Sequence, residues 1–210
     1  MQFQHPLDRV LNSEYKVRIL RFLCRKGGEW IGRRLAAALS MNPVTAHRAL
    51  RDLDQATVLD FRKVGSHFLY SLRDDHCLVR EILRPLFERE ARTQERLLDL
   101  LKREFRTNLR SSVVAAAIYG SIARGQERPT SDIDLLVLVS SAHAKRDVRD
   151  ALDRVGEEVM RTFGNPLALY VNTVHEAQQK ARRGLPVFKN ILREHHLLWG
   201  RPLREVLLGR

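Results

Sequence analysis

The chain has 210 residues, of which 44% are hydrophobic, and a formal net charge of +12 at pH 7. This length suits one or two domains with ordinary cores. Its apolar runs are far shorter than the roughly 20 residues needed to cross a bilayer, and the N-terminal residues lack the basic and apolar regions of a signal peptide. We therefore expect a cytoplasmic protein without membrane contact. The positive charge favours an anionic partner, of which nucleic acid is the commonest.

The two cysteines, Cys24 and Cys77, lie far apart in the sequence. Each occurs in an apolar pattern with helical spacing. We expect both to be small buried hydrophobic residues rather than a disulfide pair.

The first 75 residues predict three helices followed by a β-hairpin. The third helix has the clearest signals, because Asn42 can cap it and Pro43 suits its first position. Its apolar residues recur with helical spacing and predict the buried face. The segments predicted in this region are helices at Ser13–Arg25, Ile31–Leu39 and 43–55, and strands at Val58–Lys63 and His67–Leu72.

This order of elements resembles the winged helix-turn-helix transcription regulators over roughly residues 7–73. The resemblance implies that residues 43–55 enter the major groove of double-stranded DNA, while the hairpin lies along neighbouring phosphates or the minor groove. The residues to which it assigns DNA contacts are Thr45, His47, Arg48, Arg51, Arg62 and Lys63. Two alternatives stay open: these side chains are simply solvated, or the module binds a protein.

Residues 76–110 are highly charged and predict a helical linker or dimerisation helix. Pro85 must begin a second helix or kink a single one, since it removes a backbone hydrogen bond. Winged-helix regulators usually read two half-sites as dimers, so the resemblance implies a homodimer.

A third region, residues 111–210, begins with an apolar strand, Val113–Tyr119, that ends at Gly120 and Ser121. A glycine corner followed by a helix start presents backbone N–H groups to an anion such as phosphate. Further on, Asp132 and Asp134 precede another apolar run. Alternate side chains of a strand share a face, so both carboxylates should point the same way. Paired carboxylates beside a phosphate suit Mg²⁺, which takes the rest of its ligands from water and substrate.

Gly-Ser followed ten residues later by Asp-Ile-Asp resembles the signature of the DNA polymerase β nucleotidyltransferase superfamily, in particular its minimal bacterial and archaeal members. The matching residues are Gly120, Ser121, Ala123, Arg124, Gly125, Ser131, Asp132, Ile133 and Asp134. The resemblance implies an α+β fold in which helices pack on a mixed β-sheet. It assigns catalysis and Mg²⁺ to Asp132 and Asp134, and nucleotide binding to Gly120, Ser121, Arg124 and Ser131. An alternative for Arg124 is a salt bridge to Glu127.

After the paired aspartates the sequence predicts a long helix and then a third strand, with further helices and a short closing element behind it. These segments are Ala144–Phe163, Leu167–Asn172, Thr173–Arg183, Pro186–Glu194 and 197–200.

The superfamily normally adds a third carboxylate on the strand after the long helix, where it completes the metal site and acts as a general base. The strand Leu167–Asn172 contains no acid. Asn172 offers only a neutral oxygen. Glu176 is the nearest acid downstream, but with Thr173 it fits a capping box. His175 is a further candidate base, with a surface role as the alternative.

Two functions follow from these patterns. The first is a DNA-binding, Mg²⁺-dependent enzyme that transfers a nucleoside monophosphate from a nucleoside triphosphate, with ATP expected, to a hydroxyl of a protein, an RNA or a small molecule. The second is a winged-helix regulator whose degenerate transferase domain only senses nucleotide or mediates oligomerisation. The missing third acid favours the second hypothesis, whereas the Asp-Ile-Asp match favours the first.

Overall fold

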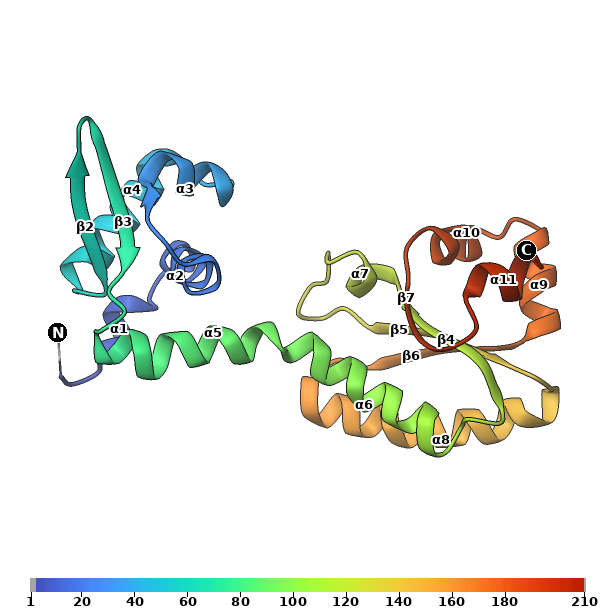
Figure 1. Cartoon of the computed structure of the whole chain (residues 1–210). Coiled ribbons are helices and arrows are strands. Elements are labelled where there is room, and N and C mark those ends of the chain that lie inside the picture. The colour runs from blue at the N-terminus through green and yellow to red at the C-terminus, as the bar shows by residue number, and fades with distance from the viewer. Residues whose placement is uncertain (1–2, 210) are drawn as a thin grey trace. The chain divides into compact units, whose positions relative to one another are not determined.

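The computed structural model describes residues 3–209. The chain forms two compact units that meet between Thr93 and Gln94. The boundary lies inside the segment for which the sequence predicts a linker, residues 76–110. We describe each unit by itself (Figure 1).

The N-terminal unit begins with helices α1 to α4 and a small antiparallel sheet of strand order β1-β3-β2. β2 and β3 pair along their whole length as the predicted hairpin, and β1 adds to the outer side of β3. This is the winged helix-turn-helix fold that the sequence predicts, with α1 and β1 as additions. Its elements are α1 (Pro6–Val10), α2 (Glu14–Lys26), β1 (Trp30–Ile31), α3 (Gly32–Ala38), α4 (Pro43–Gln55), β2 (Leu59–Val64) and β3 (His67–Leu72).

Helix α4 forms as its sequence signals indicate. The Asn42 side chain accepts a hydrogen bond from the Val44 backbone N–H at 2.9 Å, and Pro43 occupies the first turn. The predicted apolar face of α4 is buried against α2 and α3. That face consists of Ala46, Ala49, Leu50 and Leu53.

The helical segment that follows the hairpin packs partly on this first unit. A π-helical turn, η1 (Val79–Leu83), leads into α5 (Arg84–Ala91), whose first turn contains Pro85. Phe87 of α5 is buried in the N-terminal core. On the surface, Arg21 donates a hydrogen bond to Glu90 at 2.6 Å and ties α5 to α2.

The C-terminal unit contains a mixed four-stranded sheet of order β6-β5-β4-β7. β4 pairs antiparallel with both β5 and β7, whereas β5 and β6 are parallel. The α+β class with a mixed sheet is therefore confirmed. The elements are α6 (Thr93–Thr107), β4 (Val113–Tyr119), α7 (Gly120–Ala123), β5 (Ile133–Val139), α8 (Ala142–Phe163), β6 (Leu167–Thr173), α9 (Val174–Arg182), α10 (Pro186–Arg193), β7 (His196–Gly200) and α11 (Leu203–Leu208).

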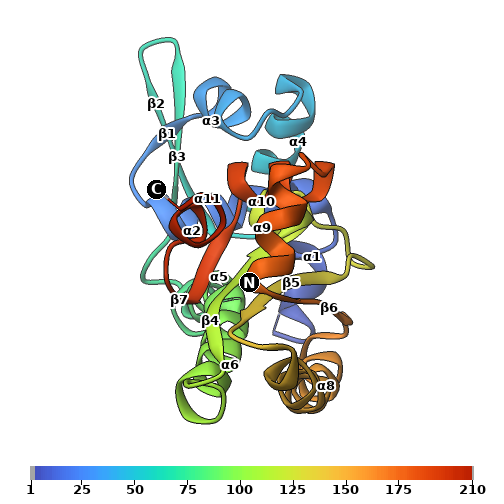
Figure 2. The same ribbon diagram turned by 90° about the vertical axis from the view of Figure 1, so that its right-hand side faces the viewer.

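Helices cover both faces of this sheet (Figures 1 and 2). α6 and α8 pack on one face, where Ile133 and Leu135 of β5 are buried. α9, α10 and α11 pack on the other face, where they contact Leu136 and Leu138. Since side chains alternate along a strand, the face under α9–α11 is also the face to which Asp134 belongs.

Within residues 3–209, no helix is both long enough and apolar enough to span a membrane. Cys24 is half-buried, but Cys77 is exposed. The expectation of two buried cysteines is therefore wrong for Cys77, which lies just before the first buried residue of its helical segment.

Candidate active site

The predicted glycine corner is present at the end of β4. Gly120 begins the one-turn helix α7, and its φ of +75° belongs to the left-handed region that favours glycine. Two residues of the signature follow the corner directly: Ser121 is half-buried in α7, and Arg124 is the exposed residue after it. The chain thus leaves a buried strand and turns at Gly120, as the sequence predicts.

Asp134 lies against this corner. In the β4–β5 ladder it pairs with Tyr119, the residue before Gly120. A Cβ on Gly120 would come within 2.9 Å of Asp134 Cγ and would overlap Asp134 Oδ2. Only a residue without a side chain allows the carboxylate this position. The sequence predicts that the aspartates lie near the Gly-Ser corner, and Asp134 does so.

The electrostatics of Asp134 suit a cation. Burial raises its pKa above the ordinary value, the negative charge of Asp132 raises it further, and the positive charge of Arg124 lowers it. Asp132 precedes β5 and is exposed. The two carboxylates therefore lie close enough to repel each other. A divalent cation would relieve this repulsion and replace the lost solvation.

Tyr119 lies opposite Asp134 in the β4–β5 ladder. Burial and the nearby groups Asp134 and Tyr170 raise the pKa of the Tyr119 hydroxyl to about 12. This hydroxyl is consequently protonated at neutral pH and is available as a hydrogen-bond donor.

Arg124 contacts Glu194 rather than Glu127. Its Nε lies 4.0 Å from Glu194 Oε2 and donates to Gln126 Oε1 at 3.3 Å. The alternative of a bridge to Glu127 is therefore wrong. Glu194 follows α10 directly and was not among the predicted site residues. Its approach depends on where the α10–β7 connection crosses the sheet end, which no local pattern signals.

Ser131 forms a hydrogen bond within the loop that precedes β5 and contains Asp132. Its hydroxyl accepts a hydrogen bond from the Arg128 backbone N–H at 2.9 Å. Asn165 Nδ2 donates to the carbonyl oxygens of Pro129 and Ser131, at 3.0 and 2.9 Å. These bonds fix the loop before β5. The nucleotide contact assigned to Ser131 stays a prediction.

Asp132 and Asp134 fit Mg²⁺ as a two-carboxylate site. Within residues 3–209, the chain has no cluster of three or more His, Cys, Asp or Glu side chains able to hold a metal. Mg²⁺ is commonly held by one or two carboxylates, waters and substrate phosphates. The donor set therefore suits a metal that arrives with a nucleotide.

Ala168 occupies the position on β6 that faces Asp134. The parallel register pairs Asp134 with Ala168 and Leu138 with Asn172. Asn172 thus lies four residues further along the strand, about 13 Å away. It is 1% exposed and accepts a hydrogen bond from Lys180. Its suggested role as a neutral metal ligand is wrong.

Glu176 and His175 lie at the opposite end of the sheet. Thr173, which pairs with Val139, forms the predicted capping box with Glu176 through bonds of 2.9 and 3.1 Å. Glu176 also accepts from Lys145 at 2.9 Å, and these contacts lower its pKa. Five strand residues, about 16 Å, separate Val139 from Asp134. Neither Glu176 nor the exposed His175 supplies the third acid or base.

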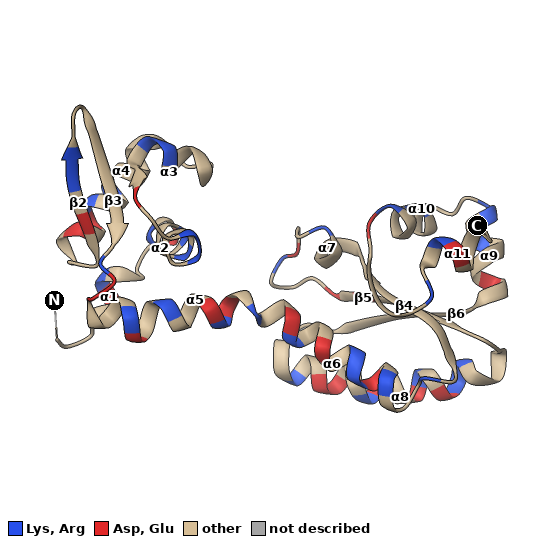
Figure 3. Cartoon of the chain, in the orientation of Figure 1, with Lys and Arg blue, Asp and Glu red and all other residues tan. Residues whose placement is uncertain are grey.

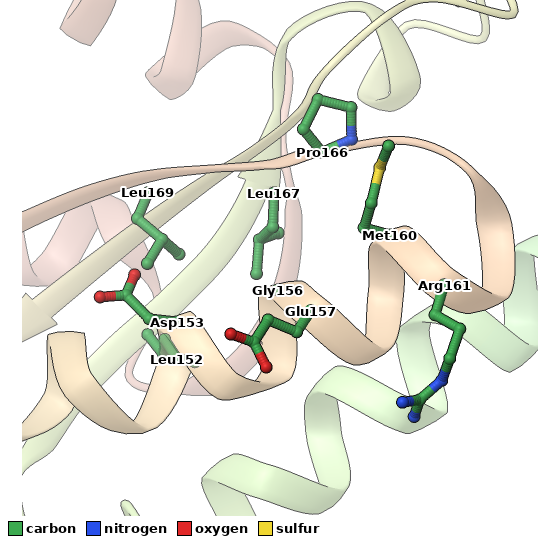
Figure 4. A pocket seen from close by; sticks show the side chains of 9 residues that line it. All are labelled: Leu152, Asp153, Gly156, Glu157, Met160, Arg161, Pro166, Leu167 and Leu169. Atoms are coloured by element: carbon green, nitrogen blue, oxygen red, sulfur yellow. The ribbon is translucent and has the colours of Figure 1, made fainter.

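A cavity of about 520 Å³ lies away from this site, between α8 and the edge strand β6. Figure 4 shows that Leu167 and Leu169 line it from the strand, while the carboxylates of Asp153 and Glu157 come from α8. Leu167 and Leu169 also pack against the core beneath α8. The cavity therefore opens on the face opposite to Asp134.

The predicted DNA-contacting residues of α4 lie on its outer side. His47, Arg48 and Arg51 are exposed and Thr45 is half-buried. His47 and Arg51 also line a cavity of about 280 Å³ between α4 and the hairpin, with the aromatic rings of Phe61, Phe68 and Tyr70. The α4 surface and the hairpin thus form one continuous surface with cationic and aromatic groups.

The two predicted residues of the hairpin differ. Lys63 is exposed on β2. Arg62 is also exposed, but it forms a two-bond ion pair with Glu29, which immediately precedes β1. A DNA phosphate would have to compete with Glu29 for Arg62.

Comparisons with known proteins find similarities for the second unit. Residues 98–195 match the family model described as a nucleotidyltransferase domain. The bifunctional uridylyltransferase/uridylyl-removing enzyme of Pseudomonas putida is 30% identical over 126 residues, which are 60% of this chain and 14% of that enzyme. The enzyme of the same name from Pseudomonas entomophila is 33% identical over 95 residues, 45% of this chain and 10% of that enzyme. The matched part is thus about a seventh of these relatives or less.

Two solved structures each resemble part of the chain. A homodimeric winged helix-turn-helix DNA-binding domain from Mycobacterium bovis is 22% identical, with a TM-score of 0.34, over 45% of this chain and 80% of that one. A toxin–antitoxin complex with AMP-PNP is 14% identical, with a TM-score of 0.35, over 53% of this chain and 82% of that one.

Proposed function

We propose that this chain, whose residues 98–195 match the family model described as a nucleotidyltransferase domain, is a DNA-binding, Mg²⁺-dependent nucleotidyltransferase. It transfers a nucleoside monophosphate, with ATP as the expected donor, to an acceptor hydroxyl. The observation that carries the proposal is the contact between Asp134 and the Gly120 corner. It brings Asp134, whose carboxylate is repelled by that of Asp132, to the place where a signature loop would hold phosphate.

Asp132 and Asp134 would hold the Mg²⁺ ion, which supplies charge neutralisation for the triphosphate and the leaving pyrophosphate. Arg124 lies near Asp134 and would contact a phosphate oxygen. The protonated Tyr119 hydroxyl, on the strand paired with that of Asp134, would donate a further hydrogen bond to the substrate. The acceptor oxygen then attacks the α-phosphorus, and pyrophosphate leaves. Without a third carboxylate, water takes the acceptor proton, so we expect slow transfer.

Transfer is tested with the full chain, MgCl₂, nucleotides labelled at the α-phosphate, and fractionated cell extract. We expect label in one acceptor fraction, no label after Asp132→Ala or Asp134→Ala, and normal labelling with the surface variant Asp153→Ala. Extracts that stay unlabelled with all four nucleotides would remove the enzyme proposal.

A second candidate function is a winged-helix regulator whose transferase domain senses nucleotide without transferring it. Ala168 at the place facing Asp134 favours this alternative, because a metal site with two carboxylates can bind Mg-nucleotide yet lack a base. Mg-ATP binding that Asp134→Ala abolishes, in the absence of any labelled acceptor, would support the regulator.

DNA binding by the N-terminal unit belongs to both candidates. We infer that α4 enters the major groove with Thr45, His47, Arg48 and Arg51, while Lys63 and Arg62 meet phosphates. Two copies on two half-sites would form the homodimer. A protein that uses DNA and nucleoside triphosphates would work in the cytoplasm.

DNA binding is tested by fluorescence anisotropy with random duplex DNA. We expect affinity that falls steeply with salt and a loss of roughly tenfold or more for Arg48→Ala plus Arg51→Ala. The matched control is Arg33→Ala plus Arg34→Ala on α3, where the two arginines are also exposed. Equal effects of both pairs would contradict recognition by α4.

A further inference from the structure

The cavity between α4 and the hairpin has a volume of about 280 Å³, and three aromatic rings form one of its walls. Phe61 and Tyr70 are directly opposite each other in the β2–β3 register, and Phe68 lies two residues from Tyr70 on the same face. The centre of the Phe61 ring is 5.3 Å from that of Phe68 and 5.4 Å from that of Tyr70. The cavity thus offers an aromatic surface to a planar ligand.

The core of the N-terminal unit does not account for this wall. Tyr70 is 3% exposed, but Phe61 and Phe68 are 45% and 41% exposed. Figure 3 shows charged residues of both signs on β2 and none on β3. The charged residues that line the cavity all belong to α4. Exposed rings gathered beside a cavity are typical of a surface that a ligand covers.

The opposite wall is a row of polar side chains on α4. His47, Arg51 and Asp54 line the cavity, and their spacing of four and then three residues places them on one side of the helix. Within residues 3–209, none of the three makes a hydrogen bond or an ion pair. Arg51 and Asp54 are oppositely charged neighbours without a salt bridge between them, so each can still bind a ligand group.

Arg51 and Asp54 both act on the hydroxyl of Tyr70. Burial raises the pKa of Tyr70, the negative charge of Asp54 raises it further, and the positive charge of Arg51 lowers it. In the described part of the chain, this hydroxyl makes no hydrogen bond. One end of the cavity therefore combines a cation, a carboxylate and a hydroxyl, while the other end is aromatic.

Duplex DNA would use only part of this cavity. Its phosphates and its guanine edges suit Arg51, but a phosphate is repelled by Asp54. Bases stacked within a duplex have covered faces, so duplex DNA leaves the three rings without a partner. A ligand that uses the whole cavity needs a planar ring with acceptors for Arg51 and N–H donors for Asp54.

We propose that this cavity binds the guanine base of a free guanine nucleoside or nucleotide, and that the bound base competes with duplex DNA for Arg51. One edge of an unpaired guanine presents the acceptors N7 and O6, followed by the donors at N1 and N2. Arg51 donates to the acceptors, Asp54 accepts from the donors, and the base stacks on Phe61 and Phe68. The competition, though not the binding itself, rests on the proposed DNA contacts of α4.

Other bases satisfy these groups less well. In a duplex, cytosine already occupies the donors of guanine that Asp54 requires, so only an unpaired guanine can contact Arg51 and Asp54 together. Adenine offers N7 and an amino group, but its N1 is an acceptor that would face Asp54. The site therefore distinguishes guanine from adenine through the carboxylate.

Binding is tested by isothermal titration calorimetry with the full chain and guanosine as the probe. Guanosine carries no phosphate, and EDTA in the buffer removes the divalent cation on which the candidate active site would depend. We expect guanosine to bind, and inosine, which lacks the 2-amino group, and adenosine to bind roughly tenfold more weakly or worse. Phe68→Ala should weaken all three nucleosides alike, because stacking does not distinguish the bases.

The decisive variant is Asp54→Asn, which should weaken guanosine binding roughly tenfold and reduce the preference over adenosine. The matched control is Asp75→Asn, which changes an exposed aspartate outside the cavity and should leave guanosine binding unchanged. Fluorescence anisotropy with duplex DNA measures the competition. Saturating guanosine should raise the Kd for DNA roughly tenfold, whereas Asp54→Asn should bind DNA at least as tightly as the unmodified protein and respond little to guanosine.

The proposal is overturned if guanosine does not bind, if adenosine binds equally well, or if Asp54→Asn and Asp75→Asn have equal effects. Guanosine that binds while DNA affinity stays unchanged would also overturn it, because Arg51 would then not be shared. Guanosine binding that depends on Asp54, in a protein without affinity for duplex DNA, would uphold the guanine site and contradict the proposed DNA binding.

Discussion

Two carboxylates in the C-terminal unit have opposite environments, which shift their pKa values in opposite directions. Glu176, at one end of the β5–β6 pair, accepts hydrogen bonds from Lys145 and the Thr173 backbone, and these lower its pKa. Asp134, at the other end, is half-buried near Asp132, and this partial burial and the neighbouring charge raise its pKa. Glu176 is stabilised by the fold, whereas Asp134 is held in a position that costs stability.

This difference is the one expected between a structural acid and the functional acid that we propose. A carboxylate that already has its partners can offer little to a metal or substrate. A carboxylate that the fold desolvates and sets against another negative charge gains most from a bound cation. Sequence distance from the Asp-Ile-Asp motif does not distinguish the two acids, because only the strand register shows which end of the sheet each occupies.

The largest expected effect comes from filling the space that Asp134 uses. Gly120→Ala adds a Cβ that overlaps the Asp134 carboxylate, at a φ that alanine rarely adopts. We expect transfer to fall by ~10²-fold or more and the free energy of unfolding to fall by about 1–3 kcal/mol. Gly125→Ala is the control for backbone strain alone, because its φ is +61° and no atom lies within 4 Å of an added Cβ. Equal losses in both variants would contradict the contact with Asp134.

The next effect adds an acid where the site lacks one. Ala168→Asp places a carboxylate opposite Asp134 on β6. If a missing base limits transfer, the rate should rise by ~10–10²-fold, as measured by label transfer at saturating nucleotide. Leu138 and Asn172 pair further along the same strands, so Asn172→Asp serves as the distant control. A rate unchanged by Ala168→Asp would mean that proton removal does not limit transfer.

A smaller effect is expected at the opposite end of the sheet. Glu176→Ala removes both the capping box and the Lys145 pair, which should cost about 1 kcal/mol of stability and leave transfer per folded molecule unchanged. Glu176→Gln can keep the box and should lose less. Because the folded-state pKa lies below the ordinary 4.5, the loss should be full at pH 7 and disappear as the pH falls through that lowered pKa. Denaturant unfolding across pH 3–7 measures this, and a loss of transfer in Glu176→Ala would give the residue a catalytic role after all.

The smallest expected effect is a gain in stability rather than a loss. The folded-state pKa of Asp134 is raised from 3.8, so its ionisation destabilises the metal-free protein at pH values above that raised pKa. Asp134→Asn should therefore stabilise the metal-free protein at pH 7, by at most about 1 kcal/mol, and the gain should vanish below the ordinary pKa. Thermal unfolding with and without Mg²⁺ measures both states: Mg²⁺ should stabilise the unmodified protein and not the variant. A variant less stable than the unmodified protein would mean that Asp134 is held by favourable contacts.

The local elements could be predicted from sequence because their signals are local. Asn42 and Pro43 mark the start of α4, Gly120 marks the corner, and alternation places Ile133 in one layer and Asp134 in the other. Contacts that depend on long-range register could not be predicted. Ala168 opposite Asp134 and Glu194 beside Arg124 follow from strand pairing and from the path of α10, and neither leaves a periodic pattern in the chain.

The division of the helical segment follows the same rule. The sequence predicts a charged helical linker or dimerisation helix over residues 76–110. In the structure, Phe87 of this segment is buried in the N-terminal core and Leu101 in the C-terminal core. An apolar stripe shows that a helix packs on something, but it does not show on which neighbour.

Under the proposed transferase function, the contact between Arg124 and Glu194 has a consequence for turnover. The guanidinium already has an anion when no nucleotide is bound, so an incoming triphosphate would exchange one negative partner for another. This competition would lower the affinity of Arg124 for the triphosphate and for pyrophosphate. After the reaction, Glu194 would pair with Arg124 again and so favour the release of pyrophosphate. An internal counter-ion of this kind trades affinity for rapid departure of the product.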